Sequence, residues 1–156
     1  LENTNLDISP ITSIGIGFGR NKKWFLGAQY DYTNSSNFKN QFFERQNISY
    51  KDGQKWVVGG YFIPNYSSFT SFWKRVVYRF GFRTQQMSII VNNSPIKETG
   101  ITFGLGLPLA GLSNANVGFE LSQRGKRDSG MVQETIASLR IGLSLNDIWF
   151  IKRRYN

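Results

Sequence analysis

The chain has 156 residues, no cysteine and no histidine, and a formal net charge of +9 from 19 Lys and Arg against 10 Asp and Glu. These numbers leave room for one ordinary domain, and they exclude a disulfide framework and the zinc sites that Cys and His build. No run of about 18 apolar residues occurs, which excludes a transmembrane helix but not a membrane-spanning sheet, where only every second residue is apolar. The polar start, Leu1 to Asp7, does not resemble a signal peptide, so we expect a processed form or a piece of a longer protein.

The first two strand-like segments alternate between apolar and polar or glycine residues, as a two-faced strand requires. In Ile11 to Gly19, three apolar residues share one face, while serine and glycines occupy the other. A tight turn leads into Trp24 to Tyr32, which repeats the pattern. The stretch Thr33 to Lys55 is rich in Asn, Ser, Gln and charge, and it is predicted to be a long loop.

Four further segments continue the series. A third strand is predicted over Trp56 to Ile63, a fourth from Val76 to about Met87, a fifth over Gly100 to Leu109 and a sixth around Val117 to Leu121. Between the third and fourth, Ser67 to Lys74 is compatible with a helical turn or with an interfacial aromatic cluster. After the sixth, the charged stretch Arg124 to Gly130 is predicted to be a loop.

The final segment, Gln133 to Phe150, alternates most strictly. It places Ala137, Leu139, Ile141, Leu143 and Leu145 on one face, and Ser138, Arg140, Gly142 and Ser144 on the other. It ends on an aromatic pair followed by a basic tail, which is typical of a strand that finishes at a membrane surface.

These segments predict an all-β, antiparallel transmembrane β-barrel to which the chain supplies about seven strands. Residues 1–156 would all belong to one outer-membrane barrel domain, with no separate soluble domain. Short connections alternate with long ones, as in outer-membrane barrels, whereas an odd number of strands indicates part of a larger barrel. A soluble β-sandwich is the alternative, and it would have to bury the apolar faces between two sheets.

Three groups of residues are the candidate functional sites of such a barrel. Charged residues on the polar strand faces would point into the lumen: Asp31, Arg79, Arg83, Glu120 and Arg140. Aromatic residues at strand ends would lie at the membrane interface: Trp24, Trp73, Trp149 and Phe150. Cations at the same strand ends would meet lipid headgroups: Lys22, Lys23, Lys74, Arg75, Lys152, Arg153 and Arg154. A structural role is the alternative for the lumen-facing residues, and a plain solvated rim is the alternative for the cations.

The sequence supports no enzyme, cofactor or metal site. Without His or Cys, the common bases and nucleophile pairs are missing. The glycines at 15, 17 and 19 and at 104 and 106 lack the spacing and the following helix of a phosphate loop. Cations at both ends of an apolar band favour lipid headgroups over a nucleic-acid groove, which would need them on one surface.

Three blocks carry a resemblance to a known family: Asn21 to Ala28 (NKKWFLGA), Gly59 to Arg75 (GGYFIPNYSSFTSFWKR) and Ser144 to Tyr155 (SLNDIWFIKRRY). They resemble the C-terminal part of an outer-membrane protein of Bacteroidetes, similar to the fatty-acid and aromatic-hydrocarbon transporter (FadL-like) group. The resemblance implies the C-terminal half of a barrel of about fourteen strands in the bacterial outer membrane. No ligand-binding motif of the transporters matches residues of this chain.

The resemblance implies two functions of different classes. One is a passive channel for hydrophobic small molecules. The other is a non-catalytic structural or accessory subunit of an outer-membrane protein secretion or assembly complex. The expected partners are outer-membrane lipid and lipopolysaccharide and, for the subunit, other outer-membrane proteins. The polar, charged strand faces offer no obvious apolar path, which favours the subunit.

Overall fold

The computed structural model describes residues 9–35, 48–91, 94–109, 113–125 and 132–144. Every regular element in these ranges is a β-strand, and none is a helix that could cross a membrane. The strands are β1 (Ile11–Arg20), β2 (Trp24–Thr33), β3 (Ile48–Tyr50), β4 (Gly53–Phe62), β5 (Val77–Val91), β6 (Ser94–Pro108), β7 (Asn114–Arg124) and β8 (Glu134–Ser144).

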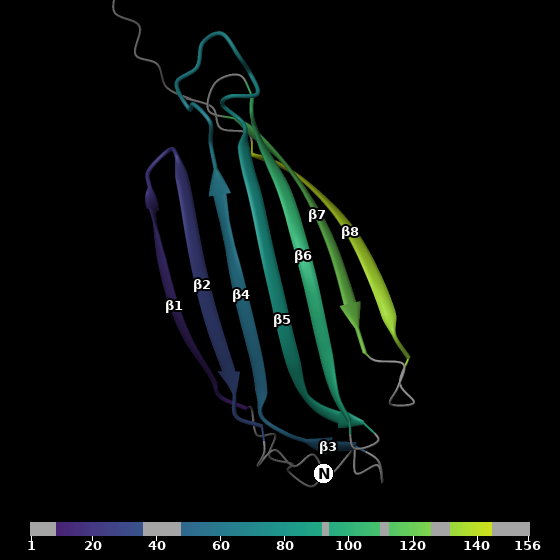
Figure 1. Cartoon of the computed structure of the whole chain (residues 1–156). Helices are drawn as coiled ribbons and strands as arrows, with labels where there is room; N and C mark the ends of the chain where they lie inside the picture. Colours follow the sequence, from purple (N-terminus) through teal and green to yellow (C-terminus); the bar gives the residue numbers. More distant parts are fainter. Residues whose placement is uncertain (1–8, 36–47, 92–93, 110–112, 126–131, 145–156) are drawn as a thin grey trace, which may run out of the picture.

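All eight strands belong to one antiparallel sheet with the order β1-β2-β4-β5-β6-β7-β8. The short β3 lies off this path and pairs with the end of β5. Figure 1 shows a single layer of long strands, with β1 at one edge and β8 at the other. The prediction of an all-β, antiparallel fold is confirmed, and the seven strands of the main path are the seven that the sequence indicates.

The strands extend further into polar sequence than predicted. The expected loop from Thr33 to Lys55 contains β3 and the first residues of β4, where Gly53 pairs with Thr33. At the same end, β5 continues to Val91 and β6 begins at Ser94, well before the predicted start at Gly100. Backbone pairing needs no apolar side chain, so the ladders continue where the hydrophobic alternation has already stopped.

The register aligns the apolar residues of neighbouring strands on one face. Across the middle of the sheet, Phe80 lies opposite Phe103, Phe103 opposite Phe119, and Phe119 opposite Leu139. A shift of one residue in any pairing would turn one strand's apolar residues to the other face. The alternation therefore excludes registers shifted by one residue, but it does not choose among those shifted by two.

The described part of the sheet has almost no core of its own. Among the described residues, Ile63 and Val76 are the only buried apolar ones, whereas Ile16, Phe103 and Ile141 remain 74%, 58% and 70% exposed. A β-sandwich would cover such a face with a second sheet, but the described strands form only one. The sandwich alternative therefore finds no support, and the apolar face needs lipid or another protein against it.

The two edge strands run in the same direction. Six successive antiparallel pairings lead from β1 to β8, so the first and last strands of the path are parallel. Pairing them directly would not give an antiparallel barrel. The described strands form an open sheet, because no described strand continues the ladder beyond β1 or β8, so the predicted barrel of about fourteen strands stays a prediction.

The close approach of β2 and β4 depends on Gly60. A methyl group on its Cα would overlap the backbone carbonyl oxygen of Phe25, whereas a methyl group at Gly142 would meet nothing within 4 Å. We expect Gly60→Ala to lower the free energy of unfolding by about 1–2 kcal/mol, since the backbone must shift to relieve the overlap. Gly142→Ala is the matched control and should change it by less than about 0.5 kcal/mol. Thermal unfolding in detergent measures the free energy of unfolding of both variants. Equal losses in Gly60→Ala and Gly142→Ala would contradict the close approach of β2 and β4 at Gly60.

Candidate functional site

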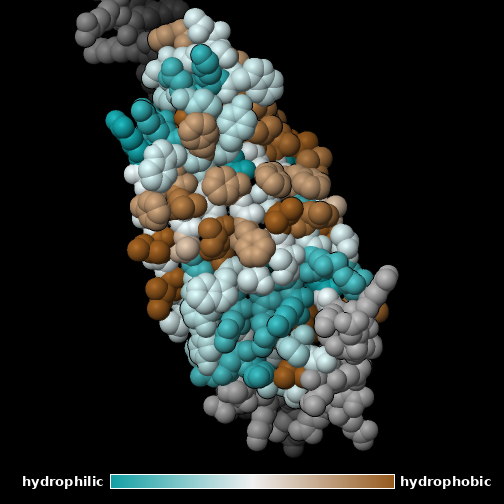
Figure 2. All heavy atoms as spheres, viewed as in Figure 1, coloured by the Kyte–Doolittle hydropathy of each residue, from teal (hydrophilic) through white to brown (hydrophobic). Residues whose placement is uncertain are grey.

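One face of the sheet carries a continuous apolar surface, which we call the apolar band. Figure 2 shows it as brown and tan side chains across the middle of the molecule, with hydrophilic residues toward both ends. Every strand of the main path contributes to the band through residues that the register places on this face: Ile14, Ile16, Phe18, Leu26, Ala28, Val58, Phe80, Phe82, Ile101, Phe103, Leu105, Val117, Phe119, Leu121, Leu139 and Ile141.

Aromatic residues border the band at both ends. At one border Trp24 packs edge-on against Phe18, with ring centroids 6.0 Å apart. At the other, the rings of Tyr30 and Trp56 lie 4.4 Å apart. The six residue steps from Trp24 to Tyr30 span about 20 Å along an extended strand, which is close to the height of the apolar surface of an outer-membrane barrel. Trp24 thus lies at one border of the apolar band, and its location at a membrane interface stays a prediction.

The opposite face carries five charged side chains in one connected group, which we call the charge network. The Arg83 guanidinium contacts both Glu98 and Glu120, and its Nη2 lies 2.7 Å from Glu120 Oε1. Arg124 Nε lies 2.7 Å from Glu98 Oε2, and Arg140 Nη2 lies 3.4 Å from Glu120 Oε2. Each carboxylate therefore lies between two guanidinium groups, and the network extends across the four strands from β5 to β8.

The register and one glycine explain how these side chains meet. Glu98 and Arg124 are direct partners in the β6–β7 pairing. Arg83 lies opposite Gly100, where a Cβ atom would be only 3.3 Å from Arg83 Nε, so the missing side chain lets the arginine lie across β6 toward Glu120. The Glu98 side chain is only 3% exposed. Burial of a carboxylate is tolerated here because two cations bind it.

The structure brings three of the five predicted polar residues together and leaves two apart. Arg83, Glu120 and Arg140 join the charge network. Arg79 instead donates from Nη1 to Asn116 Oδ1 at 2.8 Å, and Asp31 lies on β2, in the other half of the sheet. All five lie on the face opposite the apolar band, but the described strands enclose no lumen for them to line.

Sequence reasoning missed Glu98 and Arg124. Both lie beyond the predicted ends of their strands, and the hydrophobic pattern predicts a loop at Arg124. The signal that could have found them is the period of two itself, because Glu98 precedes Gly100 by two residues and Arg124 follows Ser122 by two. Extending the alternation past the last apolar residue places both on the polar face.

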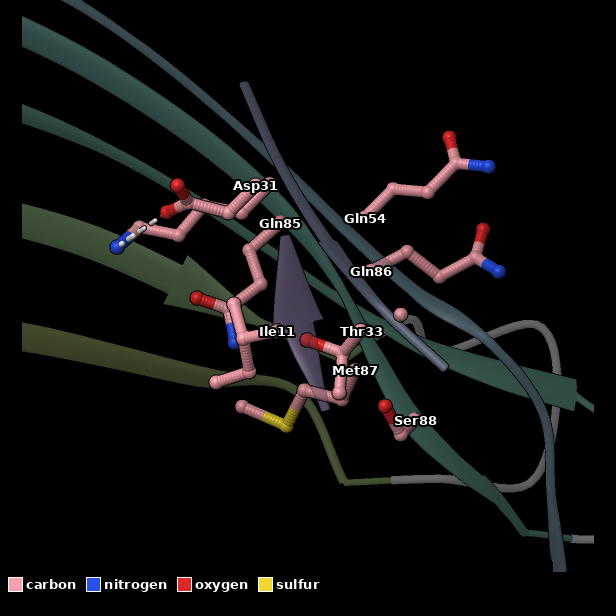
Figure 3. Close-up of a pocket in the computed structure, with 10 residues that line it drawn as sticks. Ile11, Asp31, Thr33, Gln54, Gln85, Gln86, Met87 and Ser88 are labelled. Atoms are coloured by element: carbon pink, nitrogen blue, oxygen red, sulfur yellow. Dashed lines mark ion pairs between the residues drawn. The ribbon is translucent and has the colours of Figure 1, made fainter. Parts of the chain in front are cut away.

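Asp31 has a smaller set of partners. It accepts a hydrogen bond of 2.7 Å from Gln29 Nε2 and lies 3.5 Å from Lys55 Nζ. It borders a cavity of about 230 Å³ near the ends of β2, β4 and β5 (Figure 3). In that view Gln54 and Gln86 extend away from Asp31, because these two glutamines belong to the face of the apolar band.

This cavity shows no arrangement for catalysis. It is small, and Asp31 is the only carboxylate among the described residues that line it. Across the described ranges no three Asp, Glu, His or Cys residues come close enough to hold a metal ion. The carboxylates of the charge network contact cationic side chains, which is typical of a structural role rather than of acid–base catalysis.

Predicted headgroup cations gather at one end of the sheet, which we call the basic end. It consists of the turn between β1 and β2, with the strand ends that flank it, and the connection from β4 to β5. It carries the predicted cations Lys22, Lys23, Lys74 and Arg75, together with Arg20 at the end of β1. The connection forms turns and no helix, so the possible helical turn at Ser67 to Lys74 is not seen. Instead its aromatic residues are exposed, and the Phe72 and Trp73 rings meet edge-on at 5.8 Å. The remaining predicted residues, Trp149, Phe150, Lys152, Arg153 and Arg154, lie outside the described residues.

Comparison with known proteins gives one match. A family model described as BamG matches residues 1–156, the whole length of the chain. No curated protein and no solved structure matches. The family match contradicts the resemblance to the C-terminal half of a FadL-like transporter. The three blocks behind that resemblance combine aromatic and basic residues, a feature that outer-membrane strand ends share across families.

Proposed function

Because the chain belongs to the BamG family, we propose that it is a non-catalytic accessory subunit of the complex that assembles proteins into the bacterial outer membrane. The family supports an outer-membrane assembly complex, which is the second of the two functions considered from the sequence. The first, a passive channel for hydrophobic molecules, rested on the FadL-like resemblance and loses its basis with it.

The apolar band is the observation that supports a place within the membrane. It extends without interruption from β1 to β8, is bordered by aromatic residues, and leaves side chains such as Ile14 and Leu139 70% and 66% exposed. Such a surface is unfavourable against water and favourable against hydrocarbon. On the opposite face the charges bind one another, so the sheet has one face suited to lipid and one suited to protein or water.

Within a membrane the open edges of this sheet need partners. Unpaired backbone groups are not tolerated in contact with hydrocarbon, so strands must pair with the outer sides of β1 and β8. Because β1 and β8 are parallel, an antiparallel barrel requires an odd number of additional strands. We propose that the sheet is one sector of such a transmembrane barrel, with the other strands supplied by the same protein or by another subunit.

A scaffold role would use both faces of the described sheet. An accessory subunit needs a stable surface for other proteins and a fixed position in the membrane. The charge network and the apolar band can provide these, since the network joins four strands on one face while the band holds the other face in lipid. The expected partners are the other outer-membrane proteins of the complex and the surrounding lipid.

Affinity purification tests the proposal. The full-length protein, tagged and extracted from bacterial envelopes with a mild detergent, should elute with the barrel subunit of the assembly complex in a fixed ratio. An unrelated outer-membrane barrel of similar abundance, tagged in the same way, is the control and should not recover that subunit. Elution of the tagged protein alone, with the rest of the complex intact in the same extract, would contradict an accessory role.

A further inference from the structure

The basic end carries an excess of positive charge, and no carboxylate among the described residues neutralises it. Its two segments, residues 20–24 and 63–76, contain five cations and no Asp or Glu. None of the five forms an ion pair with any carboxylate that the structure describes, whereas the charge network joins Arg83, Arg124 and Arg140 to carboxylates. Among the described residues, the cations of the basic end therefore have no counter-charge of their own.

Backbone hydrogen bonds hold the two segments together. The amide N–H of Ile63 donates to the carbonyl oxygen of Lys23 at 2.7 Å, and that of Asn65 donates to the carbonyl oxygen of Lys74 at 2.7 Å. The first bond joins the turn carrying Lys22 and Lys23 to the connection, and the second closes the connection on itself beside Lys74 and Arg75. The cations thus project from a defined scaffold rather than from independent loops.

A cavity of about 400 Å³ lies between the two segments, with Lys22, Lys23, Asn65, Tyr66 and Ser67 among its lining residues. Lys22 is held in a left-handed backbone conformation, with φ of 58°, and its Nζ lies 4.7 Å from the centre of the Tyr66 ring. Two lysines, two side-chain amides and two hydroxyls line a space to which no described carboxylate contributes. Such a donor set suits a phosphate group.

Exposed aromatic residues accompany the cations of the basic end. Phe69 is fully exposed, and Tyr66 and Trp73 are 51% and 63% exposed. Trp24 and Phe62, at the border of the apolar band, belong to the strands that lead into the same two segments. Cations beside aromatic rings at the end of an apolar surface match the layer where lipid headgroups meet acyl chains.

We propose that the cavity at the basic end binds the phosphate of an anionic glycerophospholipid, with Lys22 and Lys23 as its main ligands and the exposed aromatic residues against the acyl chains. Lys74 and Arg75 add to the attraction from the neighbouring connection. This inference rests on the proposed location in the outer membrane. It adds to that location a specific lipid site that anchors one end of the sheet.

The test measures lipid retained by the full-length protein purified within its complex. Native mass spectrometry is performed after exchange into detergent containing equal amounts of phosphatidylglycerol and phosphatidylethanolamine. Lys22→Gln/Lys23→Gln should reduce the preference for phosphatidylglycerol roughly 10- to 30-fold, because each cation near an anionic lipid surface contributes a factor of about five. Lys22→Arg/Lys23→Arg keeps both charges and should retain the preference.

The matched control is Lys51→Gln/Lys97→Gln, which removes the same charge from the opposite end of the sheet, where both lysines are exposed. An equal loss of the preference for phosphatidylglycerol in the two double variants would overturn the proposed site, because general charge attraction would then explain the binding. The Lys22→Gln/Lys23→Gln variant could instead keep its lipid preference and lose its partner subunits. That result would overturn the lipid site and indicate that the two lysines contact an acidic protein surface. Displacement of the lipid by millimolar inorganic phosphate would show a free-phosphate site and would also overturn the proposal. A failure of the proposed function itself is distinguishable, because the complex would then not co-purify even in the unmutated protein.

Discussion

Leu139→Lys is expected to destabilise the membrane-inserted protein by about 2–4 kcal/mol, the cost of a lysine near the middle of a lipid-facing barrel surface. Leu139 lies in the central row of the apolar band, next to Phe119, and its side chain is 66% exposed. In water, an exposed leucine could be replaced by lysine with little effect. The size of the loss therefore shows whether hydrocarbon covers the band. Urea unfolding from lipid vesicles, followed by tryptophan fluorescence, gives the free energy.

Ser138→Lys is the matched control, since it introduces the same side chain one residue away on the other face. Ser138 lies opposite Glu120 in the β7–β8 pairing, so a lysine there would approach a carboxylate rather than lipid. We expect a change of less than about 1 kcal/mol. If both variants unfold at the same urea concentration as the unmutated protein, the apolar band does not face lipid.

Glu98→Gln should lower the free energy of unfolding by about 2 kcal/mol, because it removes the charge between Arg83 and Arg124 and preserves the side-chain volume. Loss of one partner of a fully buried ion pair costs about 3–5 kcal/mol. A smaller loss is expected here, because the Arg83 and Arg124 side chains are 28% and 41% exposed and can regain some hydration. Thermal unfolding of the purified full-length protein in detergent, extrapolated to a common temperature, measures the difference.

Glu134→Gln is the appropriate control for the charge network. Glu134 is an exposed carboxylate at the start of β8, on the same face as Glu98 and directly opposite Arg124. Glu134 forms no ion pair with a described residue, so its neutralisation should change the free energy of unfolding by less than about 0.5 kcal/mol. Equal free energies of unfolding for the Glu98→Gln and Glu134→Gln variants would contradict a structural role for the charge network.

The alternation of side chains along single strands predicts most of the fold. In β8, the run from Ala137 to Leu143 places every second residue on one face, and the structure retains that division. The same is true of the glycine-rich β1 and of the phenylalanines of β5 and β6. The period of two is local, since it depends only on the geometry of an extended chain, and for that reason the sequence is sufficient to show it.

The ends of the strands are less predictable, and this affects the site. Glu98 lies in a polar stretch without a hydrophobic signal, yet it is the most buried member of the charge network. Its partners Arg83 and Arg124 are 15 and 26 residues away along the chain. A pairing over such distances depends on the register of three strands, which the individual segments do not specify.

The sequence by itself determined an antiparallel sheet with one apolar and one polar face, bordered by aromatic and basic residues, because these properties depend on side-chain order along single strands. Only the tertiary structure decided which charges meet, since Arg83 reaches Glu120 across the bare backbone of Gly100. It also showed that β1 and β8 are open, parallel edges of the described sheet, a consequence of how many strands pair and in which order. Ion pairing and sheet closure are properties of the register between strands, and the register exists only once the whole sheet has formed.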